Sequence, residues 1–371
     1  MCRKYFIPFG ARRFNESAGN MPYGLKMMQE NAGIKIAVPE RIRLEASSVC
    51  QLRCPSCRRT GKGTLGQPVG NGTLKLADFK KLLDDNPEIR EIELANQGEV
   101  FLNPDLPDIL RYACKKHVAL TANTGVNLNS SNEELLEALV KYQFRSIVVS
   151  IDGASAGTYS IFRVNGNFDR VLENIRKINA FKERHQSVYP ALTWKFIVFR
   201  HNEHDEVKAR ELAQDLKMSF QSTMNFDERY DTVHDLERFR RKPGAAVSDL
   251  AEHRRKYKTR LLQDYCCYQL WNQPQINWDG KVLGCCNNLR GEFGGNAFRD
   301  GLQNSLNTEK IQYARRMLLG ASPPRDDLPC TRCAIYQEML WDDSYLSGNR
   351  IQWRGRMKEA MELWGNSYIG S

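Results

Sequence analysis

The stretch that decides the fold of this 371-residue chain reads Leu44-Glu45-Ala46-Ser47-Ser48-Val49-Cys50-Gln51-Leu52-Arg53-Cys54-Pro55-Ser56-Cys57. It overlaps a strand-like segment at residues 42–46, and its three cysteines have the spacing C-x3-C-x2-C. A loop of this kind brings three thiolates close together and provides no fourth ligand of its own. Cysteine thiolate is the usual protein ligand of iron–sulfur clusters. Three such ligands on a four-iron cube would leave one iron open to a small molecule.

Two other interpretations of Cys50, Cys54 and Cys57 stay open. Structural zinc sites also use cysteines at short spacing, but they close the metal with four ligands. The nearest histidine, His117, is sixty residues further along the chain. The three cysteines could also be reduced thiols of an ordinary protein core. The spacing therefore indicates a cysteine site without identifying the metal.

Composition limits the class of protein. The chain is 41% hydrophobic and 26% charged, which is typical of a globular protein. It has no apolar run of about 18 residues that would predict a membrane helix, and its first residues make a poor signal peptide. We therefore expect a cytoplasmic protein with no membrane partner, in which the eleven cysteines do not form a disulfide framework and the clustered ones serve metal binding or catalysis.

The formal net charge of +10 is compatible with an anionic substrate, a nucleic acid, an acidic partner protein or a solvated surface. No basic run interleaved with aromatic residues resembles a nucleic-acid-binding module, so we expect no nucleic-acid partner.

Strand-like and helix-like segments alternate from residue 42 to about residue 220. The expected strands cover residues 42–46, 91–94, 118–122, 146–151 and 192–199. The expected helices cover residues 76–83, 105–116, 131–141, 168–184 and 207–216. Such alternation implies parallel strands joined by right-handed crossovers, and predicts an α/β fold with a partial, open (β/α)6-type barrel. Ligands of such sheets bind at the carboxyl ends of the strands.

A second group of cysteines lies between residues 265 and 333. Asp279-Gly280, between two apolar segments, predicts a hairpin turn that brings Cys267 and Cys285 to one end. The pair Cys330 and Cys333 would then close the site. Four thiolates can hold either zinc or a fully ligated iron–sulfur cluster. The remaining cysteines, Cys2, Cys114, Cys266 and Cys286, are expected to be buried small hydrophobic residues. Cys266 could, however, replace Cys267, and Cys286 could replace Cys285.

Together these features resemble the radical S-adenosylmethionine (SAM) superfamily. The resemblance implies that SAM binds the open iron and that its reductive cleavage supplies a 5′-deoxyadenosyl radical, which takes a hydrogen atom from the substrate. The second group resembles the SPASM/twitch-like auxiliary-cluster domain, in its shorter form with one auxiliary cluster. The implied cofactors are therefore SAM and two [4Fe-4S] clusters. The implied metal ligands are Cys50, Cys54 and Cys57 for the SAM-binding cluster, and Cys267, Cys285, Cys330 and Cys333 for the auxiliary one.

Loops that follow predicted strands match the positions that bind SAM in this superfamily. These positions are Gln97, Gly98, Glu99, Asn123, Ser150, Asp152 and Arg163. The resemblance implies that a carboxylate and a close backbone hold the SAM amino group, while a serine and an arginine hold its carboxylate. Each residue also has an ordinary interpretation: a turn for Gly98, helix caps for Glu99 and Asp152, and a solvated charge for Arg163.

The sequence predicts five segments. They are an N-terminal extension (1–40), the radical SAM partial barrel (41–225), a linker or helical segment (226–262), the auxiliary-cluster domain (263–345) and a C-terminal helix or tail (346–371).

The first functional hypothesis is a radical SAM oxidoreductase or epimerase that acts on a polyhydroxylated small molecule, such as a sugar, aminoglycoside or aminocyclitol. The short extension resembles that of aminocyclitol dehydrogenases. We expect a sugar-like or anionic substrate and a one-electron reductant such as flavodoxin or ferredoxin. An epimerase also needs a thiol that returns a hydrogen atom from the opposite face, and Cys286 is the candidate.

Two alternatives remain. One is a maturase that modifies a ribosomally made peptide, although residues 1–40 are short for the leader-binding domain that such enzymes often carry. The other, from a different class, is a non-catalytic zinc-binding protein with two cysteine sites. Iron and sulfide analysis separates this last class from the first two.

Overall fold

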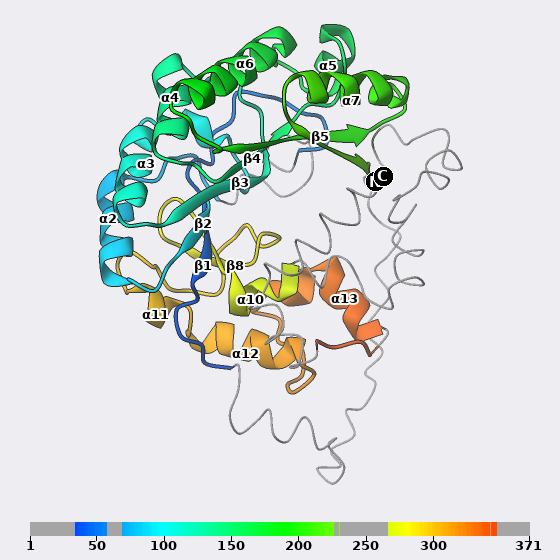
Figure 1. The fold of residues 1–371 in the computed structure, drawn as a ribbon. Helices are drawn as coiled ribbons and strands as arrows, with labels where there is room; N and C mark the ends of the chain where they lie inside the picture. The colour runs from blue at the N-terminus through cyan, green and yellow to red at the C-terminus, as the bar shows by residue number, and fades with distance from the viewer. Residues whose placement is uncertain (1–33, 58–68, 226–229, 231–265, 342, 347–371) are drawn as a thin grey trace.

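The computed structural model describes residues 34–57, 69–225, 230, 266–341 and 343–346. Its centre is a curved sheet with helices on the outer, convex side (Figure 1). The strands in this part of the chain are β1 (Arg41–Leu44), β2 (Glu91–Glu93), β3 (Ala119–Val126), β4 (Ser146–Ser150), β5 (Ala191–Val198), β6 (Ser219–Met224), β7 (Gln275–Ile276) and β8 (Val282–Gly284). The helices of the barrel region are α2 (Leu76–Asp85), α3 (Leu106–Lys115), α4 (Glu133–Lys141), α5 (Ala156–Phe162), α6 (Phe168–Arg184) and α7 (Glu206–Asp215). Those that follow are α10 (Gln269–Asn272), α11 (Leu302–Ser305), α12 (Glu309–Leu318) and α13 (Ala334–Trp341). Single 3-10 turns are η1 (Val100–Leu102), η2 (Glu203–Asp205) and η4 (Pro329–Arg332).

The described strands form one sheet in the order β6-β5-β4-β3-β2-β1-β7-β8. Each neighbouring pair from β1 to β6 is parallel, and a helix crosses over between successive strands. The predicted α/β open barrel is therefore confirmed. Its parallel strands all present their carboxyl ends at one edge, which is where the candidate SAM-binding loops lie.

The hairpin predicted at Asp279-Gly280 forms from β7 and β8, which pair antiparallel. Gly280 adopts a φ of +84°, a left-handed conformation that glycine accepts without strain. The sequence did not indicate that β7 pairs with β1, where Arg43 lies opposite Gln275. The Nε of Arg43 donates a hydrogen bond of 2.9 Å to the Oε1 of Gln275. The C-terminal cysteine-rich region therefore extends the sheet of the barrel.

Strand β3 runs further than expected, through Asn123-Thr124-Gly125 to Val126. The prediction that the strand stops at Asn123 is wrong, and the carboxylate of Glu93 on β2 explains why. This carboxylate accepts hydrogen bonds from the backbone N–H of Asn123 (2.8 Å) and of Thr124 (3.1 Å). The two bonds hold the chain extended through the segment in which the pairing of β3 with β4 shifts its register.

Two elements have no clear signal in the sequence. Helix α5 begins at Ser155, whose side chain accepts a hydrogen bond from the backbone of Thr158. Strand β6 lies at the edge of the sheet and pairs only with β5. Its polar sequence, SFQSTM, hides the strand pattern because little of it faces an apolar core.

The two faces of the sheet differ in chemistry. On β5, Leu192, Trp194, Phe196 and Val198 are buried in one apolar cluster with side chains of the helices, such as Ile175 and Ala209. The alternate residues Thr193, Lys195 and Ile197 are only half-buried on the inner face. This alternation leaves an accessible concave face inside the barrel.

Several predicted segments fall largely outside the described residues, namely 1–33 of the extension, most of the linker at 226–262, and 347–371 of the tail. Among the described helices, none has the length and apolarity to cross a membrane.

Candidate active site

The three cysteines of the first group lie in the loop that follows β1. The backbone N–H of Cys57 donates to the carbonyl of Cys54 at 3.1 Å, which closes a tight turn between them. Cys54 is buried, whereas Cys50 and Cys57 are half-buried. The apolar side chains that pack around this group are Leu52, Phe162, Ile197 and Phe199. The loop therefore presents three sulfurs in a largely apolar pocket.

The pKa shifts of Cys50 and Cys54 show that the three sulfurs lie near one another. Burial raises the pKa of Cys50 to about 11, and the negative charges of Glu99, Cys54 and Cys57 add to the effect. Burial also raises the pKa of Cys54, while the Arg163 guanidinium acts in the opposite direction. Thiolates in such a pocket need a compensating cation, and a bound metal supplies one.

The donor set fits an iron–sulfur cube. Among the described residues, no three Cys, His, Asp or Glu side chains gather as a site for a single metal ion. A cube carries its cysteine ligands on different irons, so its ligands need not converge on one point. The Nδ2 of Asn127 donates to the Sγ of Cys50 and the Nη1 of Arg163 to the Sγ of Cys54, both at 3.7 Å. Hydrogen bonds to ligand sulfurs tune the potential of such clusters.

Glu45, which the sequence analysis missed, fixes the loop that carries Gln97 and Gly98. Its carboxylate accepts hydrogen bonds from the backbone N–H of Gln97 at 3.0 Å and of Gly98 at 3.1 Å. The side chain is fully buried, and burial raises its pKa to about 7. In the sequence, Glu45 is one acidic residue directly after a strand, Arg41–Leu44, that already carries two arginines.

We expect the burial of Glu45 to make stability depend on pH. The folded protein holds the proton up to about pH 7, whereas the unfolded chain loses it near 4.5. The contribution of Glu45 to stability is thus fully present below pH 4.5 and is lost as the pH rises through 7. Glu45→Gln removes this titration. The wild type should therefore lose stability relative to the variant as the pH rises: the difference between their free energies of unfolding should fall by roughly 3 kcal/mol between pH 5 and pH 8.

Anaerobic urea titrations at a series of pH values measure this difference. Glu134→Gln, at an exposed position on α4, is the matched control for the same chemical change. A pH-independent difference for Glu45→Gln would contradict the assignment.

Gly98 and Glu99 lie against the loop of the first cysteines. The backbone N–H of Glu99 donates to the carbonyl of Val49 at 2.8 Å. A Cβ at Gly98 would lie 2.1 Å from the carbonyl oxygen of Ser47, so only glycine permits this approach. The Gly98 backbone therefore packs directly on the segment that leads into Cys50.

Glu99 fits the role of a partner for the SAM amino group. Its Oε2 accepts a hydrogen bond of 2.7 Å from the backbone N–H of Asn127. Its Oε1 is buried and has no hydrogen-bond partner among the described residues. Burial raises the pKa of Glu99 to about 7, so an ammonium group at Oε1 would stabilise the carboxylate. The side chain does not cap η1, which was the ordinary interpretation.

Asp152 and Arg163 bind each other. The Nε and Nη2 of Arg163 both lie 2.6 Å from the Oδ2 of Asp152, and the Oδ1 of Asp152 accepts the backbone N–H of Ile197 at 2.7 Å. The Arg163 side chain is 13% exposed, so it is not a solvated charge. The structure brings both residues to the first cysteine group, where Arg163 links Asp152 to Cys54.

Ser150 ends β4, whereas Asn123 lies within β3, beside the first residue of β4. A Cβ at Gly125 would come within 2.5 Å of the Ser150 Oγ, which shows how closely β3 and β4 approach there. The Oδ1 of Asn123 accepts a hydrogen bond of 2.8 Å from the Oγ of Ser146. Their proposed contacts with the SAM carboxylate and ribose stay predictions.

The second cysteine group gathers from three segments. Cys267 precedes α10, Cys285 follows β8, and Cys330 and Cys333 lie in and after η4. Burial raises the pKa of Cys267, and the negative charges of Cys285, Cys330 and Cys333 contribute. Burial likewise raises the pKa of Cys285 to about 12. The four predicted ligands are therefore mutual neighbours, with Cys267 buried and the other three half-buried, as full ligation of a cluster requires.

Comparison with known families matches both regions. A model of the radical SAM superfamily matches residues 44–213, and a model of the SPASM iron–sulfur cluster-binding domain matches residues 266–334. The chain belongs to the radical SAM superfamily and is of the SPASM type. Its cofactors are accordingly SAM and [4Fe-4S] clusters, as predicted.

Among individual relatives, the chain is similar to the antilisterial bacteriocin subtilosin biosynthesis protein AlbA of Bacillus subtilis. The two are 24% identical over 349 residues, which cover 85% of this chain and 71% of AlbA. The AdoMet-dependent heme synthase of Methanosarcina barkeri is 32% identical over 139 residues, 37% of this chain and 38% of that protein.

Solved structures show a similar fold. SuiB of Streptococcus suis bound to S-adenosylmethionine has a TM-score of 0.56 at 13% identity. The superposition covers 85% of this chain and 74% of the SuiB chain. SuiB bound to the precursor peptide SuiA has a TM-score of 0.57 at 13% identity. That superposition covers 84% of this chain and 73% of the SuiB chain.

Proposed function

We propose that this radical SAM protein removes a hydrogen atom from a carbon of a polar, hydroxyl-rich small molecule, such as a sugar, aminoglycoside or aminocyclitol. The product is an oxidised or epimerised molecule. The observation that carries this proposal is the polar inner face of the barrel sheet.

Paired residues on neighbouring parallel strands point to the same face, and the inner face is defined by three register pairs. Val148 pairs with Thr193, Ser150 with Lys195, and Lys195 with Gln221. Further positions on this face are Ser146, Ala191, Ile197, Ser219 and Thr223. Most of these side chains donate or accept hydrogen bonds, which suits a substrate covered with hydroxyl or amino groups.

Lys195 adds a charge to this face. Burial lowers its pKa, while the Asp152 carboxylate acts in the opposite direction. Asp152 already binds Arg163, and within the described residues Lys195 has no ion pair. A half-buried ammonium with hydroxyl and amide neighbours suits a carboxylate or phosphate on the substrate.

The residues around the first cysteines define where the cofactors would bind. Cys50, Cys54 and Cys57 would hold the SAM-binding cluster, and Glu99 with Ser150 would orient SAM. When bound, these cofactors supply the radical that starts the reaction. The auxiliary cluster would be held by Cys267, Cys285, Cys330 and Cys333. A protein of the flavodoxin or ferredoxin class would supply the electron.

The test uses reconstituted enzyme that is reduced under anaerobic conditions in heavy water with SAM. A panel of sugars, sugar phosphates, aminoglycosides and aminocyclitols is compared with peptides. We expect 5′-deoxyadenosine above the substrate-free background only with the small molecules. Solvent deuterium at one carbon indicates epimerisation, and a new carbonyl indicates oxidation. An epimerase that works normally as Cys286→Ala would exclude Cys286 as hydrogen donor.

A second candidate function is modification of a ribosomally made peptide. The similarity to a bacteriocin biosynthesis protein over 85% of this chain favours it. A precursor peptide encoded beside this gene would then stimulate 5′-deoxyadenosine formation and gain a mass change. Such a result, with no response to the small molecules, would replace the first proposal.

Lys195→Met should lower kcat/KM for an acidic substrate by about tenfold to a hundredfold, because a hydrogen bond to a charged group is worth roughly 1.5–3 kcal/mol. Lys195→Arg keeps the charge and should retain more activity. The control is Lys177→Met on the outer surface of α6, where Lys177 pairs with Glu173. An equal loss of substrate-free SAM cleavage in Lys195→Met would show that Lys195 acts on SAM instead.

A further inference from the structure

A second sulfur pair lies beside the auxiliary site. The Sγ atoms of Cys266 and Cys286 are 3.7 Å apart. Each is adjacent in sequence to a predicted cluster ligand, Cys267 or Cys285, and the sequence left open which member of each pair binds the metal. In the structure, the Cys267 thiol is a neighbour of Cys285, Cys330 and Cys333.

The segments that carry the two thiols are held together by a hydrogen bond. Cys285 and Cys286 lie in the turn that follows β8, where the backbone N–H of Asn288 donates to the carbonyl of Cys285 at 3.2 Å. The backbone N–H of Cys286 donates a hydrogen bond of 2.7 Å to the Oε1 of Gln269 on α10. Gln269 itself is buried and follows Cys266 closely in the chain. This hydrogen bond links the segment that carries Cys266 to the segment that carries Cys286, and it keeps the two thiols near each other.

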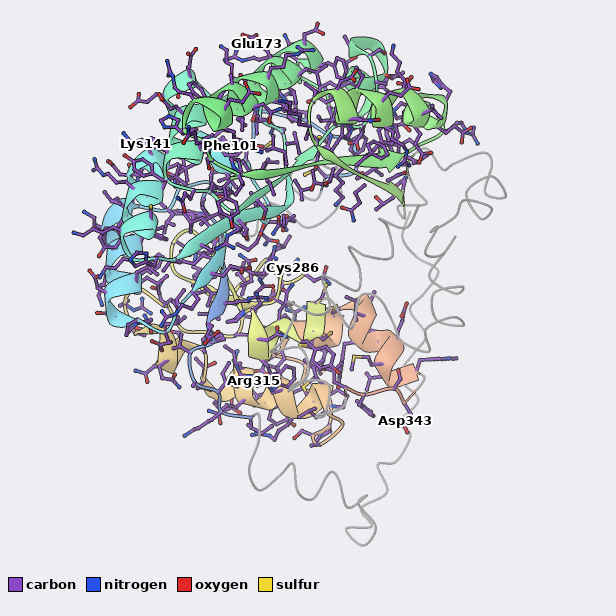
Figure 2. The ribbon with its side chains drawn as sticks, in the orientation of Figure 1. Phe101, Lys141, Glu173, Cys286, Arg315 and Asp343 are labelled. Atoms are coloured by element: carbon purple, nitrogen blue, oxygen red, sulfur yellow. The ribbon has the colours of Figure 1, made fainter. Side chains whose placement is uncertain are left out.

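The two thiols differ in exposure. Cys266 is 6% exposed, whereas Cys286 is half-buried. Figure 2 shows Cys286 between the barrel sheet and the C-terminal helices, with Arg315 and Asp343 on the far side of this region. A small molecule would therefore reach Cys286 first.

We propose that Cys266 and Cys286 form a redox-active dithiol, separate from the cluster ligands, that a low-molecular-weight disulfide of the glutathione class oxidises. The Cys286 sulfur attacks one sulfur of the small disulfide, which gives a mixed disulfide and releases one small thiol. The Cys266 sulfur then attacks the Cys286 sulfur and releases the second small thiol. The two protein thiols lose two electrons and two protons, and the small disulfide gains both.

The geometry permits the second step. A disulfide has an S–S length of about 2.05 Å, so closure from 3.7 Å requires a modest rotation of the two side chains. The consequence for turnover rests on the proposed function. While the pair is oxidised, Cys286 has no hydrogen atom to return to a substrate radical, so epimerisation stops.

The experiment maps thiols in the cluster-loaded protein. Anaerobic protein is treated with oxidised glutathione, alkylated, digested with trypsin and analysed by mass spectrometry, and its iron is measured. One tryptic peptide, 261–281, contains Cys266 and Cys267, and the next, 282–290, contains Cys285 and Cys286. We expect these two peptides to become linked while iron stays near about eight per chain.

Single variants assign the link and keep the test independent of substrate. Cys266→Ser and Cys286→Ser should each abolish the link and keep full iron, whereas Cys114→Ser should change neither. The absence of a link in the wild type, or a link that persists in Cys266→Ser, overturns the proposal. Loss of about half the iron in Cys286→Ser or Cys266→Ser also overturns it, because that residue is then a ligand. None of these outcomes depends on the identity of the substrate.

Discussion

Cys54→Ala should abolish 5′-deoxyadenosine formation and remove about half of the bound iron. The SAM-binding cluster has only three protein ligands, so it should not be retained when one of them is removed. The protein should then lose about four of its about eight iron atoms. Cys54 is buried and accepts a hydrogen bond from Arg163, so no neighbouring sulfur can take its place without rearrangement. We expect activity to fall at least about a thousandfold, since without the cluster no radical is formed.

Iron and sulfide analysis, with chromatography of SAM cleavage products, measures both effects. The matched control is Cys114→Ala on α3, a half-buried cysteine outside both groups. It should keep full iron and activity. Retention of full iron and of SAM cleavage by Cys54→Ala would contradict the ligand assignment. Zinc in place of iron in the wild type would instead favour the non-catalytic zinc protein.

Gly98→Ala should disrupt both the fold around the first cysteines and the binding of SAM. A Cβ there would lie 2.1 Å from the Ser47 oxygen and 2.7 Å from the Ser48 Cα, and both are backbone atoms. Backbone cannot rotate away as a flexible side chain can, so the two loops must separate. We expect a loss of stability of about 3 kcal/mol and a loss of SAM affinity of more than about tenfold, because Glu99 moves with Gly98.

Anaerobic thermal unfolding and titration with SAM, followed by the cluster spectrum, measure these losses. Gly157→Ala on α5 is the control, since the nearest atom to its Cβ would be the Ser155 Oγ at 3.8 Å. Alanine is favoured over glycine within helices, so this variant should be unchanged or slightly more stable. Wild-type SAM affinity in Gly98→Ala would show that the close approach is not needed.

The sequence was informative wherever local pattern carried the signal. The spacing of Cys50, Cys54 and Cys57 needs only one loop, and helix α6 was predicted at its observed limits because its apolar stripe is long and regular. The predicted stop of β3 at Asn123 failed for the opposite reason. The Glu93 carboxylate that holds this segment extended comes from another strand.

In the candidate site too, local motifs could be predicted from the sequence, whereas contacts between distant segments could not. Sequence motifs indicated Glu99 and Arg163, but not that Arg163 would bind Asp152, eleven residues before it. Glu45 and Lys195 were missed because a single charged residue in or just after a strand has no local signature. Their meaning depends on which strand lies beside them.

By itself, the sequence determined the family, the parallel barrel and the seven candidate cluster ligands, because spacing and alternation are properties of short stretches of chain. Tertiary structure alone decided that β7 pairs with β1, that the inner face is polar, and that the sulfurs of Cys266 and Cys286 lie 3.7 Å apart. The physical reason is that hydrogen-bond register and side-chain proximity between distant segments arise from packing, which no local pattern records.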